Sequence, residues 1–373
     1  MERRPNFEFF PHRRSRWGRS AGLGLLLLCL ASCGRPQVLL IGPELQELGS
    51  AVRGNAAFSS SLAGWKLQTD GTTLPRRAVV LRLTTTPGWD LPPSFPAPEK
   101  IPDNWRSGWQ YQLPASLERP AREPGGAWTA VPLFYDPWGV SVAADGPKSA
   151  APPQDLGRLA AMSPKGSLLV AGLRPSFRQW AFFSSATVAD PNLALWFGQG
   201  RSSWQAGFAA LEAVKNSAAW QSNAWYLSPG DVAQIRASHP AAVVLETFRD
   251  YESGNAKGSR RFYPFESGSG NGGAVGGMVV FAEVLGDAQA LKEAAPLLRL
   301  LAGSGFQKDV QTETHWLAAN LEAPGLDEAS SAAQYLVRQA RAFFPLTDRL
   351  PDPPIGGNLF SEIQLAIDRA PRK

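Results

Sequence analysis

Short apolar runs that alternate with helical stretches are the feature that most limits what this chain can fold into. The runs are rich in leucine and β-branched residues, which is typical of buried strands. They are Val38–Ile41, Ala78–Leu83, Ser167–Val170, Ala241–Leu245 and Gly277–Phe281. Strands that are separated by helices favour an α/β fold with parallel pairing.

Capping residues and apolar faces with helical periodicity predict the helices. One follows Asp287 and ends at Gly303, and another runs from about Glu328 through Phe343 and Phe344 to Pro345. Two more are predicted after Ser202–Ser203 and from Phe360 to Ile367.

Residues 1–32 have the layout of a secretory signal peptide. Six arginines and two glutamates within the first 20 residues precede the apolar run Ala21–Leu30 and the small residues before Cys33. This run is too short for a membrane-spanning helix, which needs roughly 20 apolar residues. We therefore expect the folded protein to begin after the signal.

The end of this segment, Leu30-Ala31-Ser32-Cys33, resembles the lipobox of bacterial lipoproteins. The resemblance implies that the chain is exported, cut before Cys33, and acylated on that thiol. Several acyl chains anchor a protein stably, whereas one does so only marginally. The protein would then face the periplasm or the exterior from a cell membrane. The alternative is an ordinary cleaved signal that ends in a cysteine by chance.

Removing the signal changes the charge of the chain. The whole sequence has a net charge of +5, but 31 Lys+Arg and 30 Asp+Glu remain after residue 32. A nucleic-acid partner needs a clustered positive surface, and no such cluster is apparent in the sequence. Cys33 is the only cysteine that remains, so stability must come from a hydrophobic core and not from an internal disulfide.

Three segments of the mature sequence resemble the extracellular solute-binding proteins of ABC importers, in particular the maltose-binding-like sugar binders (family 1). Val131–Val140 (VPLFYDPWGV) resembles the first crossover of that family, and His239–Leu245 resembles the strand before a ligand-facing loop. Gly272–Phe281 followed by Asp287–Leu301 resembles the return crossover with its helix. The three segments occur in the order that the family has.

This resemblance implies a two-lobe periplasmic-binding-protein type II fold. Each α/β lobe is a mixed, mainly parallel sheet flanked by helices, and crossover strands form the hinge. Lobe one would hold residues 33–137 and 262–318, and lobe two 138–261 and 319–373. The resemblance also implies a monomeric, non-enzymatic protein that captures a small polar solute, a carbohydrate in the first place. The partners would be ABC permease subunits, and no cofactor is implied.

Aromatic and acidic side chains near strand ends are the candidates for ligand binding. Trp89, Trp138 and Trp180 offer flat apolar faces with one polar N–H, which suits sugar rings; the alternative is packing in the core. Tyr135 and Asp136 stand in the crossover, where Asp136 either accepts hydrogen bonds from hydroxyls or stabilises the local backbone.

The residues that follow Ala241–Leu245 are a second set of candidates, because open α/β sheets bind ligands at the carboxyl ends of their strands. Glu246, Phe248 and Arg249 either contact the ligand or form a solvated turn. Gly272 and Gly273 belong to a glycine-rich turn that either presents backbone N–H groups to the ligand or is simply an adaptable loop.

Other chemistries have little support in the sequence. Gly268, Gly270 and Gly273 form a formal GxGxxG, but a strand and not a helix is predicted after it, against a dinucleotide site. The mature chain has no HExxH, CxxC or GxSxG motif, so we predict neither a metal site nor catalytic residues. The functional alternatives are a surface adhesin or receptor related to solute binders and, with less support, a secreted glycan hydrolase.

Overall fold

The computed structural model describes residues 35–346 with some gaps. The gaps are 56–58, 61–63, 70–72, 88–90, 92–93, 110, 123–126, 145–154, 164, 172–173, 175, 178, 182, 185–208, 211, 240–241, 255–257 and 268–272. Cys33, Trp89, Gly272 and the helix starts predicted at Ser202–Ser203 and Phe360 lie outside the described residues.

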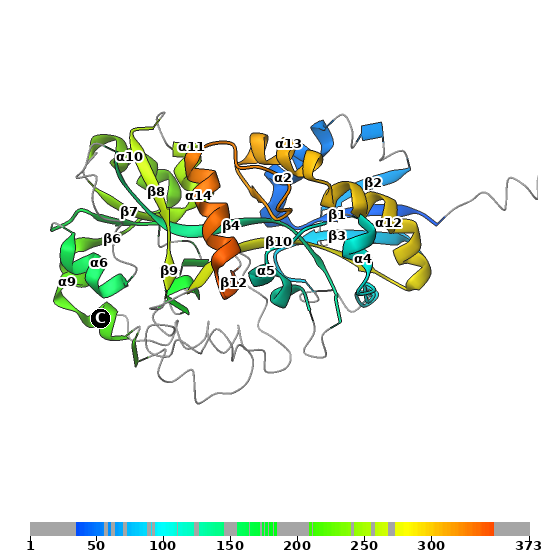
Figure 1. Cartoon of the computed structure of the whole chain (residues 1–373), viewed down its shortest axis with the longest axis horizontal. Helices are drawn as coiled ribbons and strands as arrows, with labels where there is room; N and C mark the ends of the chain where they lie inside the picture. Colours follow the sequence, from blue (N-terminus) through cyan, green and yellow to red (C-terminus); the bar gives the residue numbers. More distant parts are fainter. Residues whose placement is uncertain are drawn as a thin grey trace, which may run out of the picture.

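The strands form a sheet with the order β2-β1-β3-β10-β4-β7-β5-β6 (Figure 1). These strands are β1 (Gln37–Ile41), β2 (Trp65–Thr69), β3 (Val79–Thr84), β4 (Val131–Ala143), β5 (Leu168–Val170), β6 (Ala224–Tyr226), β7 (Val243–Thr247) and β10 (Ala274–Leu285). In addition, β8 (Arg260–Pro264) and β11 (Leu317–Ala318) pair with β4, while β9 (Glu266–Ser267) and β12 (Ala342–Leu346) pair with β10. All five predicted strands are present, which confirms the α/β prediction.

Helices pack around this sheet. They are α2 (Gln46–Gly54), α4 (Trp105–Trp109), α5 (Ala115–Glu118), α6 (Leu156–Met162), α9 (Ala218–Asn223), α10 (Pro229–Ser238), α11 (Phe248–Gly254), α12 (Ala288–Ala302), α13 (Ser304–Thr314) and α14 (Glu328–Gln339), with short 3-10 turns at Pro43–Leu45 and Arg119–Ala121. At the start of α12, the Asp287 carboxylate accepts a hydrogen bond from the backbone N–H of Ala290 at 2.8 Å. Gly303 is the C-cap residue of the same helix. The prediction for α12 is therefore confirmed at both ends.

The helix predicted from Glu328 to Pro345 is too long. It begins at Glu328 as expected, after a capping box formed by Asp327, but it ends at Gln339. Residues Ala342–Leu346 instead form β12, parallel to the start of β10. Because they are neighbours in a strand, Phe343 and Phe344 point to opposite faces of the sheet and join different hydrophobic clusters. The strand therefore buries both rings, which the end of a helix with one apolar face would not do.

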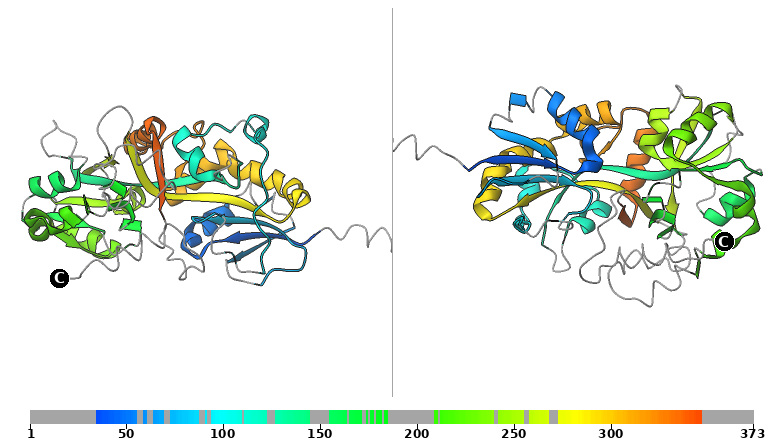
Figure 2. Two further views of the ribbon diagram at one scale, coloured as in Figure 1. Left: turned by 90° about the horizontal axis from the view of Figure 1, so that it is seen from below. Right: turned by 180° about the vertical axis from the view of Figure 1, so that it is seen from behind.

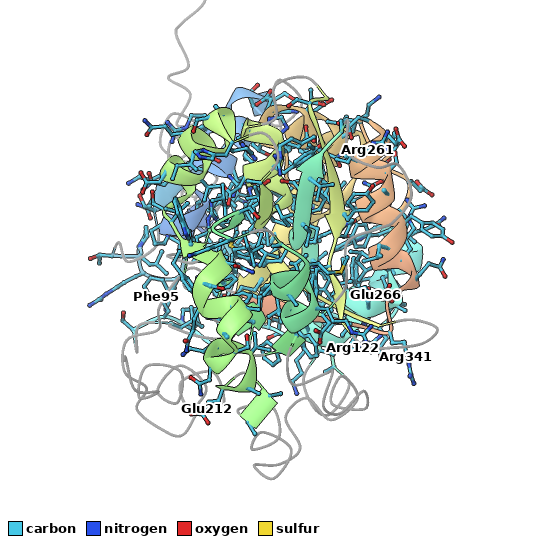
Figure 3. The ribbon with its side chains drawn as sticks, turned by 90° about the vertical axis from the view of Figure 1, so that its left-hand side faces the viewer. Phe95, Arg122, Glu212, Arg261, Glu266 and Arg341 are labelled. Atoms are coloured by element: carbon cyan, nitrogen blue, oxygen red, sulfur yellow. The ribbon has the colours of Figure 1, made fainter. Side chains whose placement is uncertain are left out.

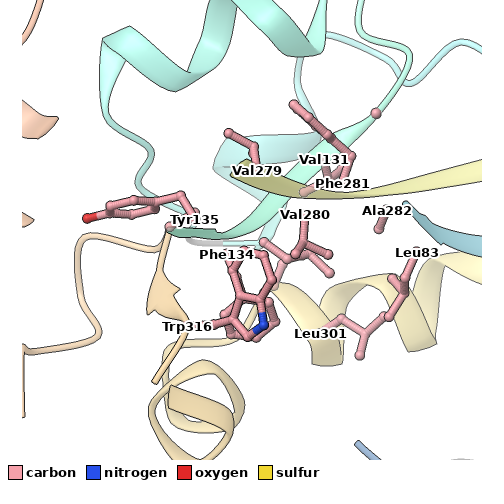
Figure 4. Packing of buried hydrophobic residues seen from close by; sticks show 14 of the residues in the cluster. Leu83, Val131, Phe134, Tyr135, Val279, Val280, Phe281, Ala282, Leu301 and Trp316 are labelled. Carbon is pink, nitrogen blue, oxygen red and sulfur yellow. The ribbon is translucent and has the colours of Figure 1, made fainter. Parts of the chain in front are cut away.

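The helices and strands gather into two halves on either side of the middle of the molecule (Figure 1). The first half comprises β1, β2 and β3 with α2, α12 and α13, and the second half comprises β5, β6 and β7 with α6, α9 and α10. Most residues of one large hydrophobic cluster lie in the first half, and those of another lie in the second. Strands β4 and β10 contribute to both clusters. Figure 4 shows the first cluster, where Phe134 of β4 lies over Trp316 and near Val280 of β10.

Helix α14 lies across the middle of the molecule, against β8 and α5 (Figures 1 and 2). The expected lobe boundary at 137/138 falls within β4, and the one at 261/262 falls within β8. These two boundaries thus lie in strands that pair with each other, and the third, at 318/319, follows β11. The division of the chain into lobes remains a prediction.

Arg261 and Arg341 project into solvent at the outer surface (Figure 3). Among the described residues, none of the helices has the length and apolarity that crossing a membrane would require.

Candidate functional site

Strand direction brings four carboxyl ends to the middle of the molecule. Strand β4 runs from the first half into the second, and β1 and β3 run the same way because both β3 and β4 are antiparallel to β10. Strand β7 is antiparallel to β4, with Thr247 opposite Trp138, and β5 is parallel to β7. The carboxyl ends of β1 and β3 therefore face those of β5 and β7. We call this region, with the crossing of β4 and β10, the junction.

Asp136 is the most unusual polar group at the junction. Its side chain is fully buried, and Oδ1 accepts a hydrogen bond from the backbone N–H of Arg249 at 2.9 Å. Oδ2 is also buried but has no hydrogen-bond partner among the described residues. Burial raises the pKa of Asp136 to about 6, although the charge of Arg249 works in the opposite direction. The group is suited to accept a hydrogen bond from a donor that is brought to it.

Glu246, one strand away, is in a different situation. Both of its carboxylate oxygens accept hydrogen bonds from Arg236, at 2.9 and 2.7 Å, and Ser141 donates to one of them. Arg260 in turn donates to the Ser141 hydroxyl at 3.1 Å. Burial raises the pKa of Glu246 to about 7, against the lowering effect of Arg236. This buried ion network occupies the carboxylate, so the geometry favours a structural role over ligand binding.

Trp138 and Trp180 come together, but not in an open site. Their rings stack at 5.5 Å with an interplanar angle of 23°, and both side chains are fully buried. Phe265 lies edge-on to Trp180 at 4.9 Å, and a Cβ atom added at Gly276 would lie 2.9 Å from the Trp180 ring. Neither indole N–H has a hydrogen-bond partner among the described residues. The two rings pack in the hydrophobic interior of the second half, next to β10.

The close approach of β10 to β4 depends on Gly277. A Cβ atom there would lie 2.4 Å from the carbonyl oxygen of Asp136 and 2.7 Å from the Cα of Pro137. Gly273 precedes β10, and its backbone N–H donates to the carboxylate of Glu266. Its neighbour in the predicted site, Gly272, is outside the described residues.

Tyr135 and Phe248 are core residues. The Tyr135 ring packs edge-on against Phe343 at 6.0 Å, and burial raises the pKa of its hydroxyl. Phe248 packs edge-on against Phe262 at 5.4 Å. Both side chains are buried, so neither presents a surface to a ligand in this conformation. Their predicted ligand role is untested.

Arg249 links the two halves. Its guanidinium donates to the carboxylate of Glu47 on α2 and lies 4.5 Å from the centre of the Trp316 ring, while Nε donates to the carbonyl of Thr314 at 3.4 Å. With its backbone bond to Asp136, this residue contacts α2, β4 and the end of α13. Arg249 was a candidate because it follows a predicted strand, whereas no sequence pattern singled out Glu47.

Two further polar groups at the strand ends were missed by sequence reasoning. Arg174, just after β5, forms an ion pair of 2.5 Å with Asp250 of α11. Glu44, after β1, accepts hydrogen bonds from the backbone N–H and hydroxyl of Thr85 at 3.3 and 3.0 Å. The rule that placed Glu246 at a strand end would have found both.

A pocket of about 540 Å³ is lined by Asp103, Arg106, Tyr111, Gln112, Leu113, Arg122 and Leu321. None of these residues follows the carboxyl end of β1, β3, β5 or β7. The described residues contain no group of three or more His, Cys, Asp or Glu side chains suited to a metal ion.

Several solved structures have a fold similar to that of this chain. A probable secreted solute-binding lipoprotein from Streptomyces coelicolor is 14% identical with a TM-score of 0.59, over 91% of this chain and 96% of that one. The sugar-binding protein MalE from Xanthomonas citri is 12% identical with a TM-score of 0.59, over 84% and 87%. This chain has the type II periplasmic-binding-protein fold. The fold that the sequence resemblance implied is thereby confirmed.

The type II fold also occurs in an enzyme. A eukaryotic thiaminase-I, bound to the thiamin analogue 3-deazathiamin, is 9% identical with a TM-score of 0.55, over 89% of this chain and 98% of that one. No protein-family model and no curated protein matches the sequence. At these identities the likeness establishes the fold, and the function has to be argued from the junction.

Proposed function

We propose that this protein is a solute-binding lipoprotein of an ABC importer, anchored to a cell membrane through lipid on Cys33. It captures a small polar solute, a carbohydrate in the first place, at the junction between its two lobes. Closure of the lobes around the solute produces the form that a permease recognises. The ligand favours closure by the contacts that it gains only in the closed form.

The observation that carries this proposal is the arrangement of the junction. Carboxyl ends from both halves face each other there, which is where open α/β sheets bind ligands. Asp136 adds a buried carboxylate oxygen without a partner among the described residues, and such an oxygen is costly unless something donates to it. Sugar hydroxyls are suitable donors, and the similarly folded MalE is a sugar-binding protein.

We propose binding without catalysis. No cysteine follows Cys33 in the sequence, so a thiol nucleophile is not available at the junction. The similarity to a thiaminase-I makes turnover an outcome that has to be measured and not assumed.

Intrinsic tryptophan fluorescence tests the proposal, with mass spectrometry of the ligand after incubation. The panel contains mono- and oligosaccharides, amino acids and polyamines. We expect a saturable change with one carbohydrate and unchanged ligand masses. Asp136→Asn weakens this binding, whereas Asp103→Asn, a change at an exposed carboxylate, leaves it intact. Product formation would replace the proposal with a hydrolase, and a silent panel would favour an adhesin or receptor.

Membrane fractionation tests the anchor. The native protein is expected in the membrane fraction with an acylated N-terminal peptide, and Cys33→Ser abolishes acylation. A soluble native protein whose Cys33 is unmodified would contradict the lipoprotein assignment while leaving solute binding intact.

A further inference from the structure

Two of the aromatic side chains predicted to meet a sugar have no accessible surface. Trp138 and Trp180 are fully buried, whereas Tyr226 is 45% exposed. Tyr226 is the last residue of β6, which runs parallel to β5 with Tyr226 opposite Val170. The carboxyl end of β6 therefore points the same way as those of β5 and β7, toward the junction.

The Tyr226 ring is held in place. Its hydroxyl accepts a hydrogen bond from the indole N–H of Trp220 at 2.8 Å. Phe177 contacts the ring at 5.9 Å and 77°, and Trp220 contacts it at 6.2 Å and 67°. Phe177 is itself packed against Trp138 at 5.4 Å. A ring that is fixed before binding loses little conformational entropy when a ligand docks on it.

The support of this ring continues into the segment after β5. The backbone N–H of Phe177 donates to the carbonyl of Arg174 at 3.1 Å, so Phe177, which packs on Tyr226, belongs to the same turn as Arg174, which pairs with Asp250 of α11. Arg174 and Asp250 are mostly buried and held by each other. A fixed and partly exposed aromatic surface matches the apolar C–H faces of a sugar ring.

We infer that Tyr226 stacks on one ring of the bound solute, and that the site therefore selects cyclic carbohydrates over linear polyols and amino acids. This inference rests on the proposed function, because it places the ring in the same ligand. Tyr226 replaces the buried tryptophans as the aromatic contact, with Phe177 as its support.

The neighbouring residue Trp225 provides a matched control. It lies on the same strand and is 47% exposed, but adjacent strand residues point to opposite faces. A Cβ atom at Gly166 would lie 3.5 Å from its indole, which places Trp225 beside the turn before β5. Removing Trp225 thus removes as much exposed aromatic surface without touching the inferred subsite.

The test compares the wild type with Tyr226→Ala, Tyr226→Phe and Trp225→Ala by isothermal titration calorimetry. The probes are glucose, galactose, maltose, cellobiose and the linear polyols glucitol and galactitol. Tyr226→Ala should weaken binding of the preferred cyclic sugar by roughly ten-fold. Tyr226→Phe, which keeps the ring, and Trp225→Ala should stay within about three-fold of the wild type. The polyols should bind more weakly than their cyclic parents.

The inference is wrong if the wild type binds a sugar and Tyr226→Ala binds it equally well, or if Trp225→Ala loses as much affinity. Equal affinity for a sugar and its polyol would also overturn it. A wild type that binds none of the sugars contradicts the proposed function itself, and this result is seen before any variant is made. Thermal unfolding of each variant separates loss of the ring from loss of the fold.

Discussion

Replacing Gly277 with alanine is the sharpest perturbation that the crossing of β4 and β10 offers. The new methyl group would lie 2.4 Å from the carbonyl oxygen of Asp136, 2.7 Å from the Cα of Pro137 and 2.9 Å from the ring of Phe343. Two of these atoms are backbone, so no side-chain rotation can relieve the contact. The strands must move apart, and the contact of Tyr135 with Val279 is only two residues away.

The magnitude follows from two opposing effects. Alanine restricts the unfolded chain and by itself stabilises a protein by about 0.4–1 kcal/mol. Overpacking in a well-packed interior costs about 1–3 kcal/mol, and more where the backbone cannot yield. We therefore expect Gly277→Ala to lower the free energy of unfolding by roughly 2–3 kcal/mol.

Urea unfolding followed by circular dichroism measures this change, and two glycines calibrate it. A Cβ atom at Gly54, the end of α2, meets nothing within 4 Å, so Gly54→Ala reports the entropic gain alone. At Gly276 the nearest atom is 2.9 Å away but belongs to the Trp180 side chain, so that variant should be intermediate. If Gly277→Ala were as stable as Gly54→Ala, the close approach of the two strands would be refuted.

The buried ion pair between Arg82 and Glu283 joins β3 to β10 at 2.7 Å, so Glu283→Ala should lower the free energy of unfolding by about 3–5 kcal/mol in urea titrations. The exposed carboxylate of Glu47 should matter far less: Glu47→Gln, which breaks its pair with Arg249, is expected to cost under about 1 kcal/mol, and a larger loss would contradict this. Asp136 binds its proton more tightly in the folded state, since its pKa rises from 3.8 to about 6, so its contribution to stability is lost as pH rises between these values. Asp136→Asn should therefore reduce the fall in unfolding free energy from pH 4 to pH 7 by roughly 2 kcal/mol, and an unchanged pH profile would count against a buried carboxyl.

Local patterns in the sequence predicted much of the fold. Apolar runs such as Val38–Ile41 became buried strands because a strand covered on both faces needs apolar residues throughout. Asp287 predicted the start of α12 because capping depends only on neighbouring residues. The error at Phe343 and Phe344 arose because an apolar stretch fits a helix or a strand equally well, and only pairing with β10 decides between them.

The candidate site was harder to predict, because burial depends on residues far away in the chain. Trp138 follows the crossover as expected, yet Trp180 and Phe177 cover it. Asp136 and Glu246 have similar sequence contexts, but only Glu246 meets an arginine that occupies both oxygens. Tyr226 was not singled out because three residues are too short a strand to recognise from periodicity.

The position of β10 in the sheet has a consequence for biosynthesis. This strand completes the first half by pairing with β3, yet it is synthesised only after β5, β6 and β7. Pairing between such distant segments is slow, because the intervening chain must be ordered first. The edge of β3 that pairs with β10 therefore stays open until residues 274–285 have been synthesised, although β1, β2 and β3 can already pair with one another.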